Sequence, residues 1–97
     1  MALIHYEKEF EKLIENDTVV DFYATWCGPC KMFGPIFEEV ANDKSINFIK
    51  LDVDKYGDIA RKYGVMSIPT IILFNDGKEV KRHTGFMSKE DFINFLN

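Results

Sequence analysis

No stretch of this sequence is apolar over the ~20 residues that a helix needs to cross a bilayer, so we expect no membrane association. Basic residues are in the minority, with 12 Lys and Arg against 16 Asp and Glu, and the net charge is −4. A mildly acidic chain argues against nucleic acid as a partner, because phosphate binding requires a basic surface. The first residues, MALIHYEKEFEKL, lack a basic region followed by a long apolar run and do not resemble a signal peptide. We therefore expect a cytoplasmic protein.

Cysteine is scarce, with two residues in 97, and the chain has no repeats, linkers or low-complexity segments. The length suits one domain, and we expect residues 1–97 to form it. Hydrophobic residues make up 46% of the chain, which is typical of a globular protein and not of a disordered one. In a reducing cytosol, two cysteines are more often catalytic or metal-binding than a structural crosslink.

Strand-like and helix-like segments alternate along the chain. Apolar, β-favouring runs predict strands at residues 2–5, 18–24, 46–53, 70–74 and, as a charged edge strand, 79–84. Helical spacing predicts helices over residues 6–14, over 27–42 with a kink at Pro35, over 56–63, and from Ser88 to the end of the chain. We assign Met32 and Phe33 to the buried face of the second helix. This order predicts an α/β fold, a mixed sheet with helices on both faces.

Both cysteines lie in the segment VVDFYATWCGPCK, as Cys27 and Cys30. Residues i and i+3 of a helix have Cα atoms roughly 5 Å apart, inside the window of about 4.4–6.8 Å that a disulfide requires. A loop of about four residues contributes only roughly 2 kcal/mol as a crosslink, against about 4.7 kcal/mol for a 100-residue loop. The spacing therefore favours redox chemistry over a structural role.

The expected helix start adds reactivity to the first cysteine. Unpaired amide donors and the macrodipole favour a thiolate at a helix N-terminus, where we place Cys27. Gly28 and Pro29 suit this position, because proline lacks the N–H that would be unpaired there. We hypothesise that Cys27 is an exposed nucleophile and that Cys30, one turn inward, is the resolving thiol.

The cysteine pair has two other possible interpretations. Buried cysteines can pack as small hydrophobic residues, although the Gly28-Pro29 pair between them indicates a tight exposed turn. A zinc site requires about four ligands, and the remaining candidates, His5 and His83, do not have ligand spacing. We therefore expect no metal.

The motifs WCGPC at 26–30, VDFYA at 20–24 and SIPT at 67–70 together resemble the thioredoxin family, and the likeness covers nearly the whole chain. The resemblance implies the thioredoxin fold, a central mixed sheet of five strands flanked by four helices. It implies a Cys27–Cys30 disulfide and an enzyme, a dithiol–disulfide oxidoreductase that reduces protein disulfides. Thioredoxin reductase would restore the dithiol with electrons from NADPH, and no cofactor would be bound. Gly28 and Pro29 match the redox-tuning dipeptide of the reducing members of the family.

Asp21 is a lone carboxylate within an otherwise apolar strand. Burial should raise its pKa, because a buried charge costs several kcal/mol, unless the side chain points to an edge of the sheet. The resemblance favours burial and implies that Asp21 takes the proton from Cys30 through water. It also places the ammonium of Lys50 near this carboxylate, whereas the strand pattern alone would make Lys50 an ordinary surface residue.

Pro69 precedes an apolar strand, a position where a cis peptide bond is one explanation. The resemblance strengthens this prediction and would bring the Ile68 backbone beside Cys27, where it can pair with an extended substrate. A substrate-binding surface is then expected around the thiols; its members are Trp26, Met66, Ile68, Pro69, Gly85 and Phe86. Phe86 is bulkier than is usual in the family, which suggests a different substrate range.

Two alternative functions follow from the same family. Some thioredoxins are non-catalytic binding subunits of larger assemblies, with the apolar surface as the interface. An oxidase of the disulfide-isomerase kind is disfavoured by Gly28 and Pro29 and by the missing leader. We expect a monomeric reductase that maintains cell redox homeostasis through electron transport to disulfide-containing proteins.

Overall fold

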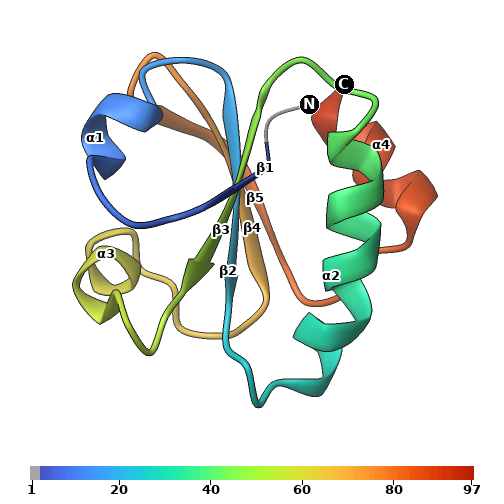
Figure 1. Cartoon of the computed structure of the whole chain (residues 1–97), viewed down its shortest axis with the longest axis horizontal. Helices are drawn as coiled ribbons and strands as arrows, with labels where there is room; N and C mark the ends of the chain where they lie inside the picture. Colours follow the sequence, from blue (N-terminus) through green and yellow to red (C-terminus); the bar gives the residue numbers. More distant parts are fainter. Residues whose placement is uncertain (1–2) are drawn as a thin grey trace.

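A computed structural model describes residues 3–97 of the chain, and Ala2 of the first predicted strand lies outside that range. Strands and helices alternate along it until a C-terminal hairpin and helix (Figure 1). Their bounds in chain order are β1 Leu3–His5, α1 Phe10–Leu13, β2 Thr18–Tyr23, α2 Gly28–Ala41, β3 Asn47–Asp52, α3 Gly57–Lys62, β4 Thr70–Asn75, β5 Lys78–Thr84 and α4 Lys89–Leu96.

The strands form one five-stranded mixed sheet in the order β1-β3-β2-β4-β5. β3 pairs in parallel with β1 and β2, whereas β4 is antiparallel to both β2 and β5. Helices α1 and α3 cover one face of the sheet, and α2 and α4 cover the other (Figure 1). The predicted fold class, a mixed sheet of five strands with four helices around it, is therefore confirmed.

β2 lies at the centre of the sheet, and its side chains alternate between two apolar cores. Val20 and Phe22 belong to the core beneath α1 and α3. Val19 belongs to the core beneath α2 and α4, where Phe33 and Phe92 also pack. Asp21 has the same parity as Val19, so its carboxyl group points to the α2 side of the sheet.

The predicted helix over residues 6–14 is more than twice as long as the observed helix α1, which has 4 residues. The backbone N–H of Tyr6 donates to the Lys50 carbonyl at 2.8 Å, so the chain still follows the sheet at that point. Glu9 then adopts a left-handed backbone conformation with φ 64°, and α1 begins only at Phe10. Apolar spacing identified the face of this segment but not the tertiary hydrogen bond that delays the helix.

The two longer helices agree with the sequence analysis in their bounds to within two residues. α2 runs through Pro35 as one element, and the kink expected there stays a prediction. Met32 is 62% exposed, so its assignment to the buried face is wrong. Its neighbour Phe33 is buried against the sheet, as predicted. α4 begins after Ser88, whose Oγ accepts a hydrogen bond of 3.1 Å from the N–H of Asp91.

Candidate active site

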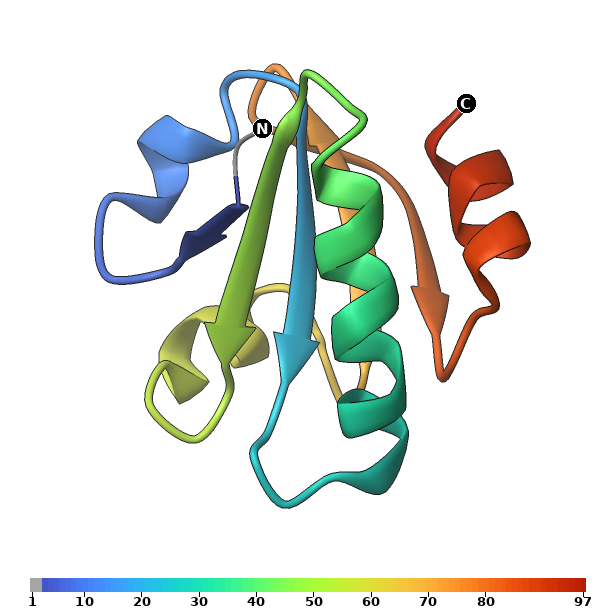
Figure 2. The same cartoon turned by 45° about the vertical axis from the view of Figure 1, so that its right-hand side comes forward.

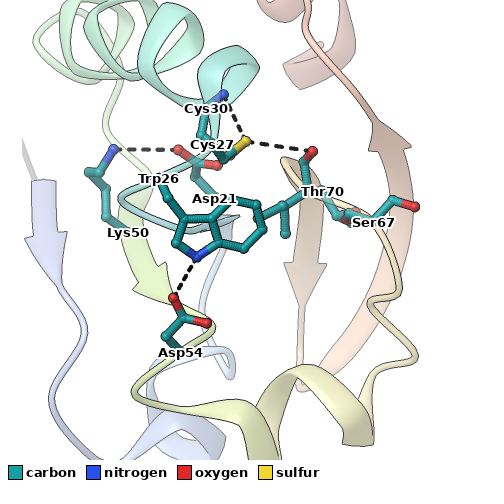
Figure 3. The surroundings of a disulfide bond; sticks show 9 residues. Asp21, Trp26, Cys27, Cys30, Lys50, Asp54, Ser67 and Thr70 are labelled. Atoms are coloured by element: carbon teal, nitrogen blue, oxygen red, sulfur yellow. Dashed lines mark hydrogen bonds and ion pairs between the residues drawn. A yellow bond between two sulfur atoms is a disulfide. The ribbon is translucent and has the colours of Figure 1, made fainter.

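The two cysteines lie where the chain leaves the carboxyl end of β2 and enters α2 (Figure 2). Cys27 is the N-cap of α2, and its Sγ accepts a hydrogen bond of 3.2 Å from the N–H of Cys30. The residues form a disulfide, with Cα atoms 5.2 Å apart (Figure 3). Pro29 in the first turn of the helix leaves no additional donor unpaired.

Neither sulfur is freely accessible in this disulfide form. Cys27 is 5% exposed and Cys30 is 3% exposed, so the exposed position expected for Cys27 is wrong. Both cysteines pack with Ala24 and with the partly buried Ile68. The helix terminus was identified from the sequence, but the contact with Ile68 comes from a segment about forty residues further along the chain and was not visible in the local pattern.

The Ile68–Pro69 peptide bond is cis, as predicted. The carbonyl oxygen of Ile68 lies 3.8 Å from Cys27 Sγ, which places this turn directly against the disulfide. The N–H of Gly85, a residue with φ 102°, donates a hydrogen bond of 2.7 Å to the Pro69 carbonyl. The turn at Ile68 and Pro69 therefore contacts the disulfide, and the segment at Gly85 is hydrogen-bonded to that turn.

Exposed apolar side chains occur on all three of these segments. Trp26 is 68% exposed, Met66 94% and Phe86 42%. The Trp26 indole Nε1 donates a hydrogen bond of 2.8 Å to Oδ2 of Asp54, a residue that the sequence analysis missed (Figure 3). Parallel neighbouring strands end at the same edge of a sheet, so the position of Asp54 shortly after β3 was a usable signal.

Asp21 and Lys50 are neighbours on the adjacent strands β2 and β3. They are paired in the register of β2 and β3, and Lys50 Nζ lies 3.5 Å from Asp21 Oδ2 (Figure 3). The Asp21 side chain is completely buried, so the alternative of an edge position is wrong. Within residues 3–97, neither of its oxygen atoms has a hydrogen-bond partner. Burial raises the pKa of Asp21 to about 6, and the nearby Lys50 charge opposes this rise.

A surface hollow of about 330 Å³ opens beside the second cysteine. Cys30, Lys50, Tyr23 and Gly34 are among the residues that line it. The hollow thus reaches the same cysteine from the α2 side of the sheet, away from the turn at Pro69. The Lys50 side chain, which pairs with Asp21, and the Cys30 side chain therefore line one solvent-accessible space.

The complete chain, residues 1–97, matches the family model described as Thioredoxin.

The chain belongs to the thioredoxin family.

Individual thioredoxins are similar over nearly the full length. Thioredoxin from Mycoplasmoides gallisepticum is 46% identical over 99 residues, covering 99% of this chain and 99% of that protein. Thioredoxin from Staphylococcus epidermidis is 47% identical over 101 residues, covering 100% of this chain and 97% of that protein.

Solved thioredoxin structures have the same fold. Reduced Schistosoma mansoni thioredoxin pre-protein superposes with a TM-score of 0.90 at 36% identity, covering 99% of this chain and 96% of that one. A mutant thioredoxin from Halobacterium salinarum gives a TM-score of 0.91 at 29% identity, covering 98% of this chain and 88% of that one.

Family membership and the paired cysteines establish the activity. The chain is a dithiol–disulfide oxidoreductase, a protein-disulfide reductase whose redox-active pair is Cys27 and Cys30. The alternative of a non-catalytic binding subunit is not favoured by a pair already at bonding distance. Membership implies interaction with thioredoxin reductase and with proteins that contain disulfides.

Thioredoxins work without a bound cofactor. Among residues 3–97, no group of three or more His, Cys, Asp or Glu side chains is placed to hold a metal ion. The helices of this same range are all too short or too polar to span a membrane.

Proposed function

We propose that Cys27 is the attacking thiolate and Cys30 the resolving thiol of this reductase. The observation that carries the proposal is the position of Cys27 as the N-cap of a 14-residue helix, with the Cys30 N–H directed at its sulfur. Aligned peptide dipoles and a direct N–H donor both stabilise negative charge on a sulfur, and thiolate is the species that attacks a disulfide. Cys30 lies within the first turn, where its charge receives less of this stabilisation.

The reaction transfers two electrons from the cysteine pair to the target. Cys27 Sγ bonds to one sulfur of the target disulfide, whose S–S bond breaks, and the other target sulfur leaves as a thiolate and takes up a proton. Cys30 then loses its proton and bonds to Cys27 Sγ. The mixed disulfide breaks, the second target thiol is released, and the protein is left in the disulfide form.

Asp21 is the proposed acceptor of the Cys30 proton, through water in the neighbouring hollow. With a pKa of about 6, its carboxyl group is mainly ionised at neutral pH and can still be protonated there. This pKa is well matched to a general base that operates near pH 7. Lys50 is proposed to stabilise the ionised carboxylate between turnovers, because its ammonium lies 3.5 Å away.

The target is proposed to bind across the disulfide, the turn at Ile68 and Pro69, and the segment at Gly85. Ile68 offers a backbone carbonyl beside Cys27, so an extended chain can pair there by adding to the backbone edge. Gly85 would permit the target backbone to approach closely. The space that a Cβ would occupy at this position holds no other described atom within 4 Å, and glycine leaves it open. Trp26, Met66, Pro69 and Phe86 complete the surface, and Gly28 and Pro29 tune the disulfide.

The electrons are proposed to come from NADPH through thioredoxin reductase. Residues 1–97 are proposed to act as a single domain, in keeping with the near-complete coverage of its bacterial relatives. A monomer in the cytoplasm is proposed as well.

Turnover with purified components tests this proposal. The protein is mixed with thioredoxin reductase, NADPH and insulin, and the loss of NADPH absorbance and of insulin disulfides is followed. We expect one NADPH consumed for each insulin disulfide reduced, and no reduction by Cys27→Ser. Insulin reduction by Cys27→Ser at the wild-type rate would overturn the assignment of the nucleophile.

A further inference from the structure

The Lys50 ammonium lies close to the Tyr23 ring as well as to the Asp21 carboxylate. Its Nζ lies 3.5 Å from Asp21 Oδ2 and 4.4 Å from the centroid of the Tyr23 ring. On the α2 side, a Cβ built on Gly34 would lie 3.4 Å from the same nitrogen, which is about the shortest ordinary van der Waals contact. The Lys50 side chain is 11% exposed despite its flexible stem. The neighbours of this ammonium therefore include Tyr23 and Gly34 as well as Asp21.

Tyr23 and Lys50 together separate two surface hollows. Both side chains line the hollow beside Cys30 and a second one, of about 170 Å³, on the other side. An ammonium is strongly hydrated and its four-carbon stem is flexible, so either hollow offers Lys50 an alternative position in water. The Asp21 ion pair alone does not fix it, because 3.5 Å is long for a charge-assisted hydrogen bond.

A ring face within ~6 Å attracts an ammonium, and the attraction is stronger where the ammonium is partly removed from water. The Tyr23 ring acts here as a neutral group. Burial and the carboxylates of Asp52 and Asp21 raise the pKa of its hydroxyl, so it does not ionise at neutral pH. The other titratable side chains around the two hollows are Lys31, Glu38, His5, Tyr6, Glu7, Asp52, Lys55 and Tyr56.

We propose that Tyr23 is a positioning residue whose ring face holds the Lys50 ammonium beside Asp21, and that it thereby controls how readily this carboxyl group takes up a proton. The inference deepens the proposed function, since it rests on the role assigned there to Asp21. Tyr23 packs against the cluster of Ala24, Cys27 and Cys30, but no part in the thiol chemistry is proposed for it. It acts through the placement of one charge.

The pKa of Asp21 in the oxidised protein is the direct test, because the bonded cysteines do not titrate. It is measured by carboxyl ¹³C NMR in the wild type, in Tyr23→Phe and in Tyr23→Leu. Phe keeps the ring, and we expect a pKa within about 0.2 of the wild type. Leu removes the ring, Lys50 moves into water, and the pKa of Asp21 should rise by about 0.5 or more. A lower or unchanged pKa in Tyr23→Leu would overturn the proposal, since a ring that only excludes water would lower it when removed.

A second variant tests whether the effect passes through Lys50. In a Lys50→Met background the charge is absent, so Tyr23→Leu should leave the pKa of Asp21 where Lys50→Met alone puts it. An equal rise in both backgrounds would contradict the positioning role. Thermal unfolding of each variant confirms that the comparison is made between folded proteins.

The wild-type protein provides a measurement that requires no variant. A ring 4.4 Å from Nζ should shift the ε-methylene proton resonances of Lys50 upfield, and random-coil shifts would overturn the proposal. These experiments involve no turnover, so they separate the two hypotheses. If Asp21→Asn reduces insulin at the wild-type rate, the proposed base is wrong, whereas the link from Tyr23 to Lys50 is judged by the pKa alone.

Discussion

The indole Nε1 of Trp26 donates a hydrogen bond of 2.8 Å to Oδ2 of Asp54. The Asp54 N–H is in turn bonded to Oδ1 of Asp52, at the end of β3, at 2.9 Å. These two hydrogen bonds attach Trp26, the residue before Cys27, to the strand next to β2. An exposed ring that would otherwise rotate freely is thus held at one orientation beside the disulfide.

Removing the acceptor should loosen Trp26 and weaken target binding. For Asp54→Leu we expect KM for insulin to rise by about 2–10-fold, the equivalent of one hydrogen bond, with little change in kcat. Asp54→Asn keeps a side-chain oxygen that can accept, so its KM should stay closer to the wild type. Steady-state kinetics and the fluorescence of the single tryptophan measure both effects. Identical behaviour of the Leu and Asn variants would show that the hydrogen bond does not position the ring.

The buried carboxyl group of Asp21 should make stability depend on pH. Its pKa is about 6 in the folded protein and 3.8 when unperturbed, so the folded state binds the proton more tightly. The stabilisation is therefore complete below about pH 4 and is lost as pH rises through about 6. Asp21→Asn should raise the free energy of unfolding at pH 8 by on the order of 1–3 kcal/mol, with a smaller gain at pH 4. Urea unfolding at the two pH values measures this, and a gain independent of pH would contradict it.

Replacing one cysteine at a time should distinguish the two sulfur atoms. Cys30→Ser keeps the attacking thiolate and removes the resolving thiol, so a mixed disulfide between Cys27 and the target should accumulate. Cys27→Ser should trap at least about tenfold less target, because Cys30 lacks the N-cap position. Non-reducing electrophoresis and mass spectrometry identify the adducts. Equal trapping by the two variants would mean that the helix terminus does not select the nucleophile.

The apolar surface near the disulfide should matter for targets, whereas an exposed apolar residue elsewhere should not. Met66→Glu places a charge two residues from Ile68, and we expect kcat/KM for insulin to fall by about 3–10-fold. Val80→Glu is the matched control, because Val80 is 56% exposed on β5 and the change adds the same charge. It should lower kcat/KM by less than about twofold. Equal losses would indicate a general effect of net charge.

Much of the fold could be predicted from the sequence because its local signals agree with its tertiary structure. The run from Thr18 to Tyr23 is buried on both faces, as its nearly continuous apolar pattern indicated. The start of α2 at Gly28 followed from Pro29 and from the apolar stripe that comes after it. The charged segment Lys78–Thr84 is an edge strand, as its composition predicted.

The remaining features depend on contacts between distant parts of the chain. The start of α1 is set by the hydrogen bond from Tyr6 to Lys50 and by the backbone of Glu9, neither of which leaves a periodic signal. The burial of Cys27 depends on Ile68, and the orientation of Trp26 depends on Asp54. Sequence spacing identified the reactive pair but could not supply these neighbours, because strand order and register bring them together.

β2 pairs along its length with β3 on one side and with β4 on the other. It carries Asp21 and ends just before the loop that leads to Cys27, so the proposed base and the proposed nucleophile are attached to the most enclosed strand of the sheet. Such strands open only with the whole domain, and their amide hydrogens are among the last to exchange with solvent. The cysteines at the end of β2 can therefore be oxidised and reduced repeatedly while the distance between Asp21 and Cys27 stays the same.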